Sequence, residues 1–199
     1  MIKRVFDIVL SLFAILLLLP LFMIIGLWVW AGSRGGMVYS QIRVGRGNRD
    51  FRMYKFRTMV PGSDTRGLLT LGGNDPRVTR AGRLLRKTKL DELPQLFNIL
   101  AGHMSFVGPR PEVRKYVDLY DEEQKKVLSV RPGLTDYASL RYIDEPEMLA
   151  ASRDPENTYV REIMPAKLEL NLKYIRERSL AKDISIIMRT IGSIFGNRK

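Results

Sequence analysis

The chain has 199 residues, of which 45% are hydrophobic, and a formal net charge of +12, which suits one domain with a sizeable core. It contains no cysteine and one histidine, His103, so disulfides, thiolate catalysis and metal sites built from cysteine or several histidines are excluded. Any metal ion must be held by oxygen ligands, which favours a hard cation such as Mg²⁺.

The positive charge is concentrated in one stretch. Residues 32–90 carry 14 Lys and Arg against 3 Asp and Glu, whereas residues 91–199 carry 17 of each. The basic stretch ends at the adjacent carboxylates Asp91 and Glu92. Two carboxylates that face a dense cationic field indicate an enzyme that acts on a phosphorylated, anionic substrate.

The first element in chain order is an apolar run. No charged residue occurs from Ile8 to Ala31, and about 20 apolar residues suffice to span a bilayer as a helix. A cleavable signal peptide is disfavoured because its apolar region is only about 7–15 residues long. Two interpretations stay open: a spanning helix, and a re-entrant helix that enters and leaves the membrane by the same face.

Pro20 and the flanking charges bear on this choice. Pro20 removes a helical hydrogen bond in mid-run, which predicts a kink. Basic residues flank both ends: Lys3 and Arg4 before the run, and Arg34, Arg43, Arg46 and Arg49 after it. Because cationic flanks prefer the cytoplasmic side, a helical hairpin satisfies both ends, whereas neither orientation of a spanning helix does.

The basic stretch is expected to form a hairpin and a short helix. The pattern predicts a turn at 32–36, a strand over 37–42, a turn at 45–48, a strand over 51–58, and a loop rich in Gly, Pro and Asp over 60–78. Thr79 is placed to cap a helix that runs through Arg86.

Asp91 is expected to cap the following helix. That position puts Pro94 in the first turn, where its missing N–H costs nothing, and it aligns the apolar residues Leu93, Leu96, Phe97 and Leu100 on one face. The helix dipole and the basic stretch should then keep the carboxylate ionised. A lone aspartate here would be only a cap, but Glu92 beside it favours a catalytic role.

The remaining pattern predicts a mostly α fold with a small β element (α+β). Helices are expected from Pro111 to about Leu128, over about 162–178 and over about 181–195, with a turn at 131–133 and an acidic, irregular loop over 144–158. The last helix is amphipathic, which suits either core packing or an interfacial position in the headgroup plane.

Several cations are candidate phosphate ligands. In a strand, Lys55 and Arg57 point to the same face. Arg110 lies between Pro109 and Pro111, which keep the backbone extended and stiff and so present the guanidinium for bidentate binding. Arg86 and its basic neighbours either cover a helix or face anionic lipid headgroups. Each cation also fits an ordinary solvated surface.

The motifs favour phosphoryl transfer. P-loop, G-x-S-x-G and G-x-G-x-x-G patterns do not occur in the sequence, so NTPase, hydrolase and dinucleotide-binding functions lack support. An aspartate can attack phosphorus and carry a covalent phosphoryl group. Mg²⁺ held at Asp91 and Glu92 would neutralise a diphosphate and assist departure of a nucleotide.

Four segments carry a resemblance to a known family: KRVFDIVLSL with a later LLP, YKFRTM, LDELPQLFNIL with MSFVGPRP, and RPGLT. With them the chain resembles the small monotopic phosphoglycosyl transferases of the bacterial sugar-transferase family, which initiate glycan assembly on polyprenol phosphate. The resemblance implies a re-entrant membrane helix over 1–31, broken near Pro20, and a cytoplasmic and interfacial catalytic domain over 32–199. It also implies a bacterial inner-membrane location with the active site on the cytoplasmic face.

The resemblance further implies a ping-pong reaction. Asp91 would attack the β-phosphate of a UDP-sugar and release UMP, and a polyprenol phosphate such as undecaprenyl phosphate would then attack the phosphosugar–Asp91 adduct. Glu92 would be a proton acceptor or a Mg²⁺ neighbour, and Arg110 part of a nucleotide-binding element. Arg4 and Arg131 join the expected substrate-binding residues. Anionic membrane lipids are expected partners, nucleic acid is not, and a homodimer is compatible with the sequence.

The chain departs from the family pattern at two places. The family often has Ser-Pro at the membrane break and Gly-x-Ala-Gln after RPGLT, where this chain has Leu19-Pro20 and residues 136–139, DYAS. The identity of the transferred sugar therefore stays open.

Two alternative functions also stay open. Aromatic and cationic residues alternate over 51–57, as in a membrane-tethered nucleic-acid-binding protein. A non-catalytic scaffold for glycan enzymes is the second alternative.

Overall fold

The computed structural model describes residues 1–32, 35–63, 67–72 and 75–195. Its helices and strands are α1 Ile2–Gly32, β1 Val38–Val44, β2 Asp50–Phe56, α2 Arg80–Lys87, α3 Gln95–Ala101, β3 Ser105–Val107, α4 Arg114–Val117, β4 Gly133–Thr135, α5 Tyr137–Arg141, α6 Glu145–Ala151, α7 Pro155–Thr158, α8 Met164–Glu177 and α9 Leu180–Phe195. The expected α+β class is confirmed. The predicted turn at Ser33 and the flanking Arg34 lie outside the described residues.

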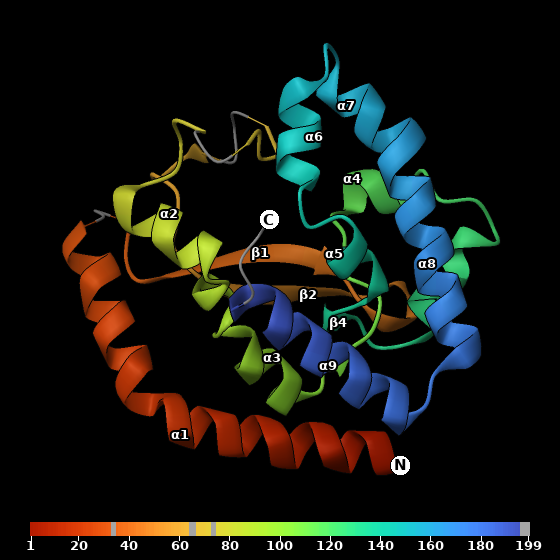
Figure 1. Ribbon diagram of the computed structural model, residues 1–199, viewed down its shortest axis with the longest axis horizontal. Helices are drawn as coiled ribbons and strands as arrows, with labels where there is room; N and C mark the ends of the chain where they lie inside the picture. Colours follow the sequence, from red (N-terminus) through yellow and green to blue (C-terminus); the bar gives the residue numbers. More distant parts are fainter. Residues whose placement is uncertain (33–34, 64–66, 73–74, 196–199) are drawn as a thin grey trace.

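Helix α1 is one continuous element of 31 residues with Pro20 inside it. It bends sharply between two arms, one along the lower edge of the molecule and one up its left side (Figure 1). Its length and composition suffice to cross a membrane. Most of its apolar side chains are exposed, including Phe13, Leu17 and Trp30, and an exposed apolar surface of this extent marks a membrane or protein contact.

Polar contacts fix the first arm of α1 to the rest of the chain. The Arg4 guanidinium donates to the carbonyl oxygens of Ile99 and Leu100 at the end of α3, at 2.6 and 2.9 Å. Asp7 is buried and accepts hydrogen bonds from the Ser105 hydroxyl and the Phe106 N–H in β3. A buried polar side chain inside an apolar helix is therefore tolerated because it is hydrogen-bonded within the protein.

The second arm packs through apolar contacts. Ile25 and Val29 are buried against Phe56 of β2 and Leu85 of α2, while the Phe22 ring lies 5.8 Å from that of Phe56. These contacts connect the bent helix to the β1–β2 hairpin, whose antiparallel register pairs Val38 with Phe56 through Val44 with Asp50. The predicted hairpin is confirmed, with strand ends shifted by one or two residues.

Helix α3 covers the free edge of β2. The Asn98 side chain accepts a hydrogen bond from the Tyr54 N–H and donates to the Arg52 carbonyl oxygen. These two bonds replace the partners that a further strand would supply, so they protect an otherwise open sheet edge.

A second sheet, absent from the sequence expectations, pairs β3 with β4 in parallel. The two backbone segments approach each other most closely where Gly108 lies against Gly133. A Cβ built on Gly133 would lie 2.2 Å from the Gly108 nitrogen. Glycine is required at both positions because only hydrogen occupies the space between the two backbones.

Two further expectations were wrong. Residues 111–128 do not form one helix, because Pro111 to Val113 stay extended and only α4 and a 3₁₀ segment at Gln124–Ser129 follow. The acidic segment 144–158 is not irregular, because α6 and α7 each begin with a proline in the first turn, where the missing N–H is tolerated. Both helices lie at the top of the view in Figure 1.

Helix α9 is amphipathic as predicted. Asp183 and Ile186 are buried, with Asp183 bound by Lys3 at 2.5 Å and by the Tyr174 hydroxyl at 2.6 Å. Its outer face exposes an apolar stripe of Leu180, Ile184, Met188 and Ile191. One face thus packs on the protein, and the other supports the interfacial interpretation over simple core packing.

Gly82 gives a test of the packing between α2 and the segment that follows β2. A Cβ at this position would lie 2.1 Å from the Thr58 carbonyl oxygen, so Gly82→Ala should lower the free energy of unfolding by about 1–3 kcal/mol, as over-packing does. Thermal unfolding in detergent micelles measures the change.

Gly192 is the matched control, because a Cβ built there in α9 meets nothing within 4 Å. Gly192→Ala should stabilise the protein by up to about 1 kcal/mol through helix propensity. Equal unfolding temperatures for the two variants would contradict the close approach of α2 to the backbone at Thr58.

Candidate active site

Asp91 and Glu92 lie in a 3₁₀ turn that joins α2 to α3. Lys89 enters the turn with φ of 57°, and Leu90–Glu92 form the 3₁₀ segment. Helix α3 begins at Gln95 with Pro94 as its N-cap residue and no side-chain cap. The prediction that Asp91 caps this helix was therefore wrong: left-handed backbone at Lys89 sets the turn, which leaves the carboxylate of Asp91 available for other contacts.

Glu92 receives two cations from distant segments. Lys55 of β2 lies 2.9 Å from its Oε1, and the Arg110 guanidinium lies 2.5 Å from the same oxygen and 3.4 Å from Oε2. Burial opposes ionisation of Glu92, but the charges of Arg110 and Lys55 prevail and hold the pKa of this carboxyl well below its ordinary value. Burial in turn lowers the pKa of Lys55 against the attraction of Glu92.

Asp91 is buried beside this cluster and forms no ion pair with any residue that the structure describes. Its relative exposure is 5%, and its Oδ1 has no hydrogen-bond partner among the described residues. Burial raises the pKa of the Asp91 carboxyl, with the charge of Lys55 acting in the opposite sense. The cationic field therefore offsets only part of the desolvation, and the ionised carboxylate at Asp91 stays a prediction.

Arg86 of α2 is a third cation close enough to feel the charges of Asp91 and Glu92. Its guanidinium donates to the hydroxyls of Thr58 and Thr70, at 2.9 and 3.2 Å. Burial lowers the pKa of Arg86, and the charge of Asp91 is the largest influence in the opposite sense. Arg86 keeps no carboxylate partner within ion-pair distance among the described residues, so its charge is available to an anionic ligand.

The loop that carries Arg110 is fixed by its backbone. Gly133 N–H donates to the Pro109 carbonyl oxygen at 2.9 Å. The Arg110 N–H donates to Oδ2 of Asp136 at 3.2 Å, while Oδ1 of the same carboxylate caps α5 through the Ser139 N–H. The RPGLT segment and its following aspartate therefore hold the Pro-Arg-Pro loop in place.

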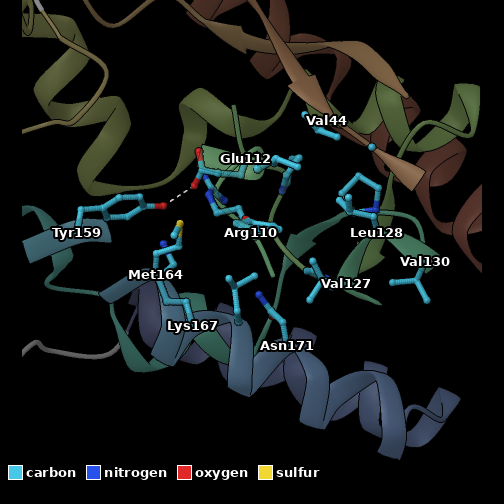
Figure 2. Close-up of a pocket in the computed structure, with 17 residues that line it drawn as sticks. Val44, Arg110, Glu112, Val127, Leu128, Val130, Tyr159, Met164, Lys167 and Asn171 are labelled. Atoms are coloured by element: carbon cyan, nitrogen blue, oxygen red, sulfur yellow. Dashed lines mark hydrogen bonds between the residues drawn. The ribbon is translucent and has the colours of Figure 1, made fainter. Parts of the chain in front are cut away.

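Behind this loop lies a small, partly open cavity of about 30 Å³, enough for one water molecule. Figure 2 shows Glu112 at its edge with its carboxylate bound to the Tyr159 hydroxyl, and Lys167 and Asn171 of α8 on the far wall. Glu112 also pairs with Arg43 at 2.8 Å. This buried network explains why the chain stays extended after Pro111: Glu112 is held inside.

Three predicted substrate-binding residues are not brought to Asp91. Arg57 follows the end of β2 and donates to the Gly36 carbonyl oxygen at 3.1 Å. Arg4 binds the far end of α3, where Arg131 also donates to Gly102. The candidate site therefore unites Asp91 and Glu92 with Lys55, Arg86, Pro109, Arg110 and Pro111.

Sequence reasoning missed three residues of the site. Lys89 acts on both carboxylates through its charge, Asp136 holds Arg110, and Gln95 is completely buried directly after Pro94. A signal existed for Asp136, since the chain departs from the family pattern there. No sequence signal pointed to Lys89, because lysine rarely adopts the left-handed backbone conformation that it has here.

Comparison with known proteins identifies the family of the chain. A family model described as bacterial sugar transferase matches residues 1–197. The chain is 39% identical over 99% of its length to UDP-N-acetylgalactosamine-undecaprenyl-phosphate N-acetylgalactosaminephosphotransferase of Aeromonas hydrophila. It is 35% identical over its whole length to UDP-glucose:undecaprenyl-phosphate glucose-1-phosphate transferase of Escherichia coli (strain K12).

The chain spans less than half of these two relatives, 45% and 41% of their lengths. It covers 94% of a third, the exopolysaccharide production protein PSS of Rhizobium leguminosarum bv. phaseoli, at 36% identity.

Glu92→Gln tests the three-way ion pair. Loss of the charge leaves Lys55 and Arg110 close together without an anion, so the free energy of unfolding should fall by about 1–3 kcal/mol, given that both cations keep some exposure. In a double-mutant cycle with Lys55→Met, the coupling should exceed about 1 kcal/mol.

The same change in a surface pair is the control. Glu122 pairs with Lys125 and its side chain is 90% exposed, so Glu122→Gln should change the unfolding free energy by less than about 0.5 kcal/mol. Similar effects of both substitutions would refute the organising role of Glu92.

Proposed function

The chain belongs to the bacterial sugar transferase family, and on that premise we propose that it transfers a sugar 1-phosphate from a UDP-sugar to undecaprenyl phosphate, with release of UMP. The observation that carries the proposal is Asp91: a buried carboxylate without an ion pair, set among Lys55, Arg86 and Arg110. The names of two relatives specify this class of reaction for those proteins. The product would be the first membrane-bound intermediate of a bacterial glycan.

The proposed reaction has two displacements. A carboxylate oxygen of Asp91 forms a bond to the β-phosphorus of the UDP-sugar, and the bond from that phosphorus to the bridging oxygen breaks, so UMP leaves with the electron pair. A phosphate oxygen of the lipid then attacks the phosphosugar and releases the Asp91 carboxylate. Removal of water from the nucleophile by burial supports its reactivity toward phosphorus.

The cations have distinct proposed roles. Arg110 lies on a stiff loop and is oriented by Glu92, so it would bind the diphosphate of the nucleotide in a fixed geometry. Lys55, whose ammonium is paired with the Glu92 carboxylate, would stabilise the charge that develops on the transferred phosphoryl group. Arg86, held by Thr58 and Thr70 rather than by a carboxylate, fits the phosphate of the incoming lipid.

Mg²⁺ fits the donor set at Asp91 better than at Glu92. The described residues hold no group of three His, Cys, Asp or Glu that could cage a metal, but Mg²⁺ is commonly bound by one or two carboxylates with substrate phosphates. Both oxygens of Glu92 are engaged by cations, whereas Asp91 is unpaired. When bound there, Mg²⁺ would neutralise the diphosphate.

We further propose that α1 lies in the bacterial inner membrane as a re-entrant hairpin, with the site on the cytoplasmic face. The bend at Pro20, the exposed apolar side chains of both arms and the outer stripe of α9 support this arrangement. The membrane interface would then run along α1 and α9, which brings a lipid phosphate within reach of the site. A nucleic-acid-binding function loses its support, because Phe51, Met53 and Phe56 pack inward and Lys55 is paired.

Asp91 can be tested without the lipid. The protein with UDP-N-acetylgalactosamine or UDP-glucose alone should release up to about one equivalent of UMP, as covalent catalysis requires, and intact-protein mass spectrometry should detect a phosphosugar on Asp91. Asp91→Asn should abolish both signals and keep the unfolding temperature. UMP release that needs undecaprenyl phosphate, with no trapped adduct, would instead indicate direct transfer.

The metal is tested by chelation. EDTA should abolish UMP release, and added Mg²⁺ or Mn²⁺ should restore it, because a chain with no cysteine and one histidine must hold a metal through oxygen ligands. Undiminished release in metal-free buffer would exclude a catalytic cation.

The membrane arrangement is tested by labelling. The sequence contains no cysteine, so single cysteines at Ile2 and Met37 can be labelled in sealed inside-out and right-side-out vesicles. Both should react from the same side. Reaction from opposite sides would mean that α1 spans the membrane, and Pro20→Ala should shift the protein toward that state because it restores a helical hydrogen bond.

A further inference from the structure

An arginine of β1 that has no part in the proposed reaction holds the residue directly after Arg110. Arg43 donates through Nη1 to the Pro111 carbonyl oxygen at 3.2 Å and to Oε1 of Glu112 at 2.8 Å. Its Nε and Nη2 donate to Oε1 of Gln41, at 3.0 and 2.7 Å. The guanidinium is thus oriented from within its own strand, so it presents Nη1 to the Pro-Arg-Pro loop in a fixed direction.

Glu112 supplies the other half of this contact. Its Oε1 accepts from Arg43 and its Oε2 from the Tyr159 hydroxyl (Figure 2), while its carbonyl oxygen accepts from the Val44 N–H at 2.9 Å. Burial opposes ionisation of Glu112, but the charges of Arg43 and Lys167 prevail and hold the pKa of this carboxyl below its ordinary value. The side chains of Arg43 and Glu112 are only 20% and 17% exposed, and a mostly buried ion pair of this kind fixes one arrangement of the chain.

Arg110 therefore lies between two anchors of the loop. On one side, its own N–H donates to Oδ2 of Asp136 at 3.2 Å. On the other side, Arg43 holds the carbonyl oxygen of Pro111 and the carboxylate of Glu112. A guanidinium binds a phosphate in bidentate fashion only when its planar fork is correctly aimed, so the two anchors determine where the fork of Arg110 points.

We propose that Arg43 and Glu112 are positioning residues, which fix the Pro-Arg-Pro loop so that the Arg110 guanidinium meets the diphosphate of the nucleotide. The proposal rests on the proposed function of the chain as a UDP-sugar transferase. Neither residue is assigned a contact with the substrate, because each acts on the backbone that follows Arg110. Loss of the pair should therefore weaken nucleotide binding only as far as that binding depends on the aim of the Arg110 fork.

The test is Glu112→Gln, which keeps the side-chain length and an acceptor for the Tyr159 hydroxyl but removes the charge that holds Arg43. The dissociation constant for UDP, measured by titration calorimetry, should rise about fivefold or more, because a misaimed fork loses bidentate contacts. KM for the UDP-sugar should rise by a similar factor while kcat stays within about twofold, as expected when ground-state binding is lost.

A second variant covers poor folding of the first. Arg43→Met with Glu112→Gln removes both charges, so no unpaired charge stays buried, and such double replacements are often neutral for stability. This variant also lacks the contact to Pro111, so its dissociation constant for UDP should rise at least as much as that of Glu112→Gln.

Arg110→Lys separates positioning from a general loss of structure. A lysine ammonium is a point charge on a flexible stem and does not depend on the aim of a planar fork. In a double-mutant cycle, Glu112→Gln should therefore weaken UDP binding by less than about twofold when Arg110→Lys is already present. A merely structural role would weaken binding by the same factor in both backgrounds.

Asp183→Asn is the matched control. Like Glu112, the buried Asp183 accepts from one cation and one tyrosine hydroxyl, those of Lys3 and Tyr174, but it joins α9 to α1. This variant should lower the unfolding temperature at least as much as Glu112→Gln, yet its dissociation constant for UDP should stay within about twofold of the wild-type value.

Equal losses of UDP affinity with and without Arg110→Lys would overturn the positioning role, as would unchanged affinity in both Glu112→Gln and the double variant. A wild-type protein that binds no UDP would instead overturn the proposed function, which is a distinguishable result.

Discussion

The carboxylate of Glu92 is the contact that holds the site together. It joins β2 through Lys55 and the Pro-Arg-Pro loop through Arg110, two segments that are far apart in the sequence. A buried ion pair adds little net stability, but removal of one partner is costly, so such a contact fixes one arrangement of the chain. Because Glu92 engages both cations, neighbouring Asp91 lies in a positive field without a direct ion pair.

The same turn connects this site to the apolar helix. Asp91 lies just before the start of α3, and the last carbonyl groups of this helix accept hydrogen bonds from Arg4 of α1. Asn98 in its middle is bound to β2. A helix of only seven residues would be marginal alone, and these polar contacts, with Leu96 and Ile99 in the core, explain why it is well defined.

Local patterns of the sequence predicted the elements that depend on local physics. The β1–β2 hairpin, the Thr79 cap of α2 and the amphipathic α9 were found because turns, caps and periodicity are written into neighbouring residues. The β3–β4 pair was not, since its strands have three residues each and meet through a close contact of Gly108 with Gly133. The acidic segment 144–158 was expected to be irregular, although Pro146 and Pro155 each lie in the first turn of a helix.

The candidate site likewise combines residues that the sequence can predict with residues that only the tertiary structure places. Asp91, Glu92 and the cations Lys55, Arg86 and Arg110 could be predicted from charge and from the family resemblance. Arg4, Arg57 and Arg131 could not be separated from them, because only the tertiary structure reveals that they bind backbone carbonyl groups instead. Helix α3 also separates Arg4 from Asp91, since Arg4 binds carbonyl groups at the end of the helix and Asp91 lies just before its start. One residue inserted into α3 would lengthen it by about 1.5 Å and turn its end by about 100° about the helix axis relative to the carboxylate. The length of α3 therefore sets both the distance and the rotation between the first arm of α1 and Asp91.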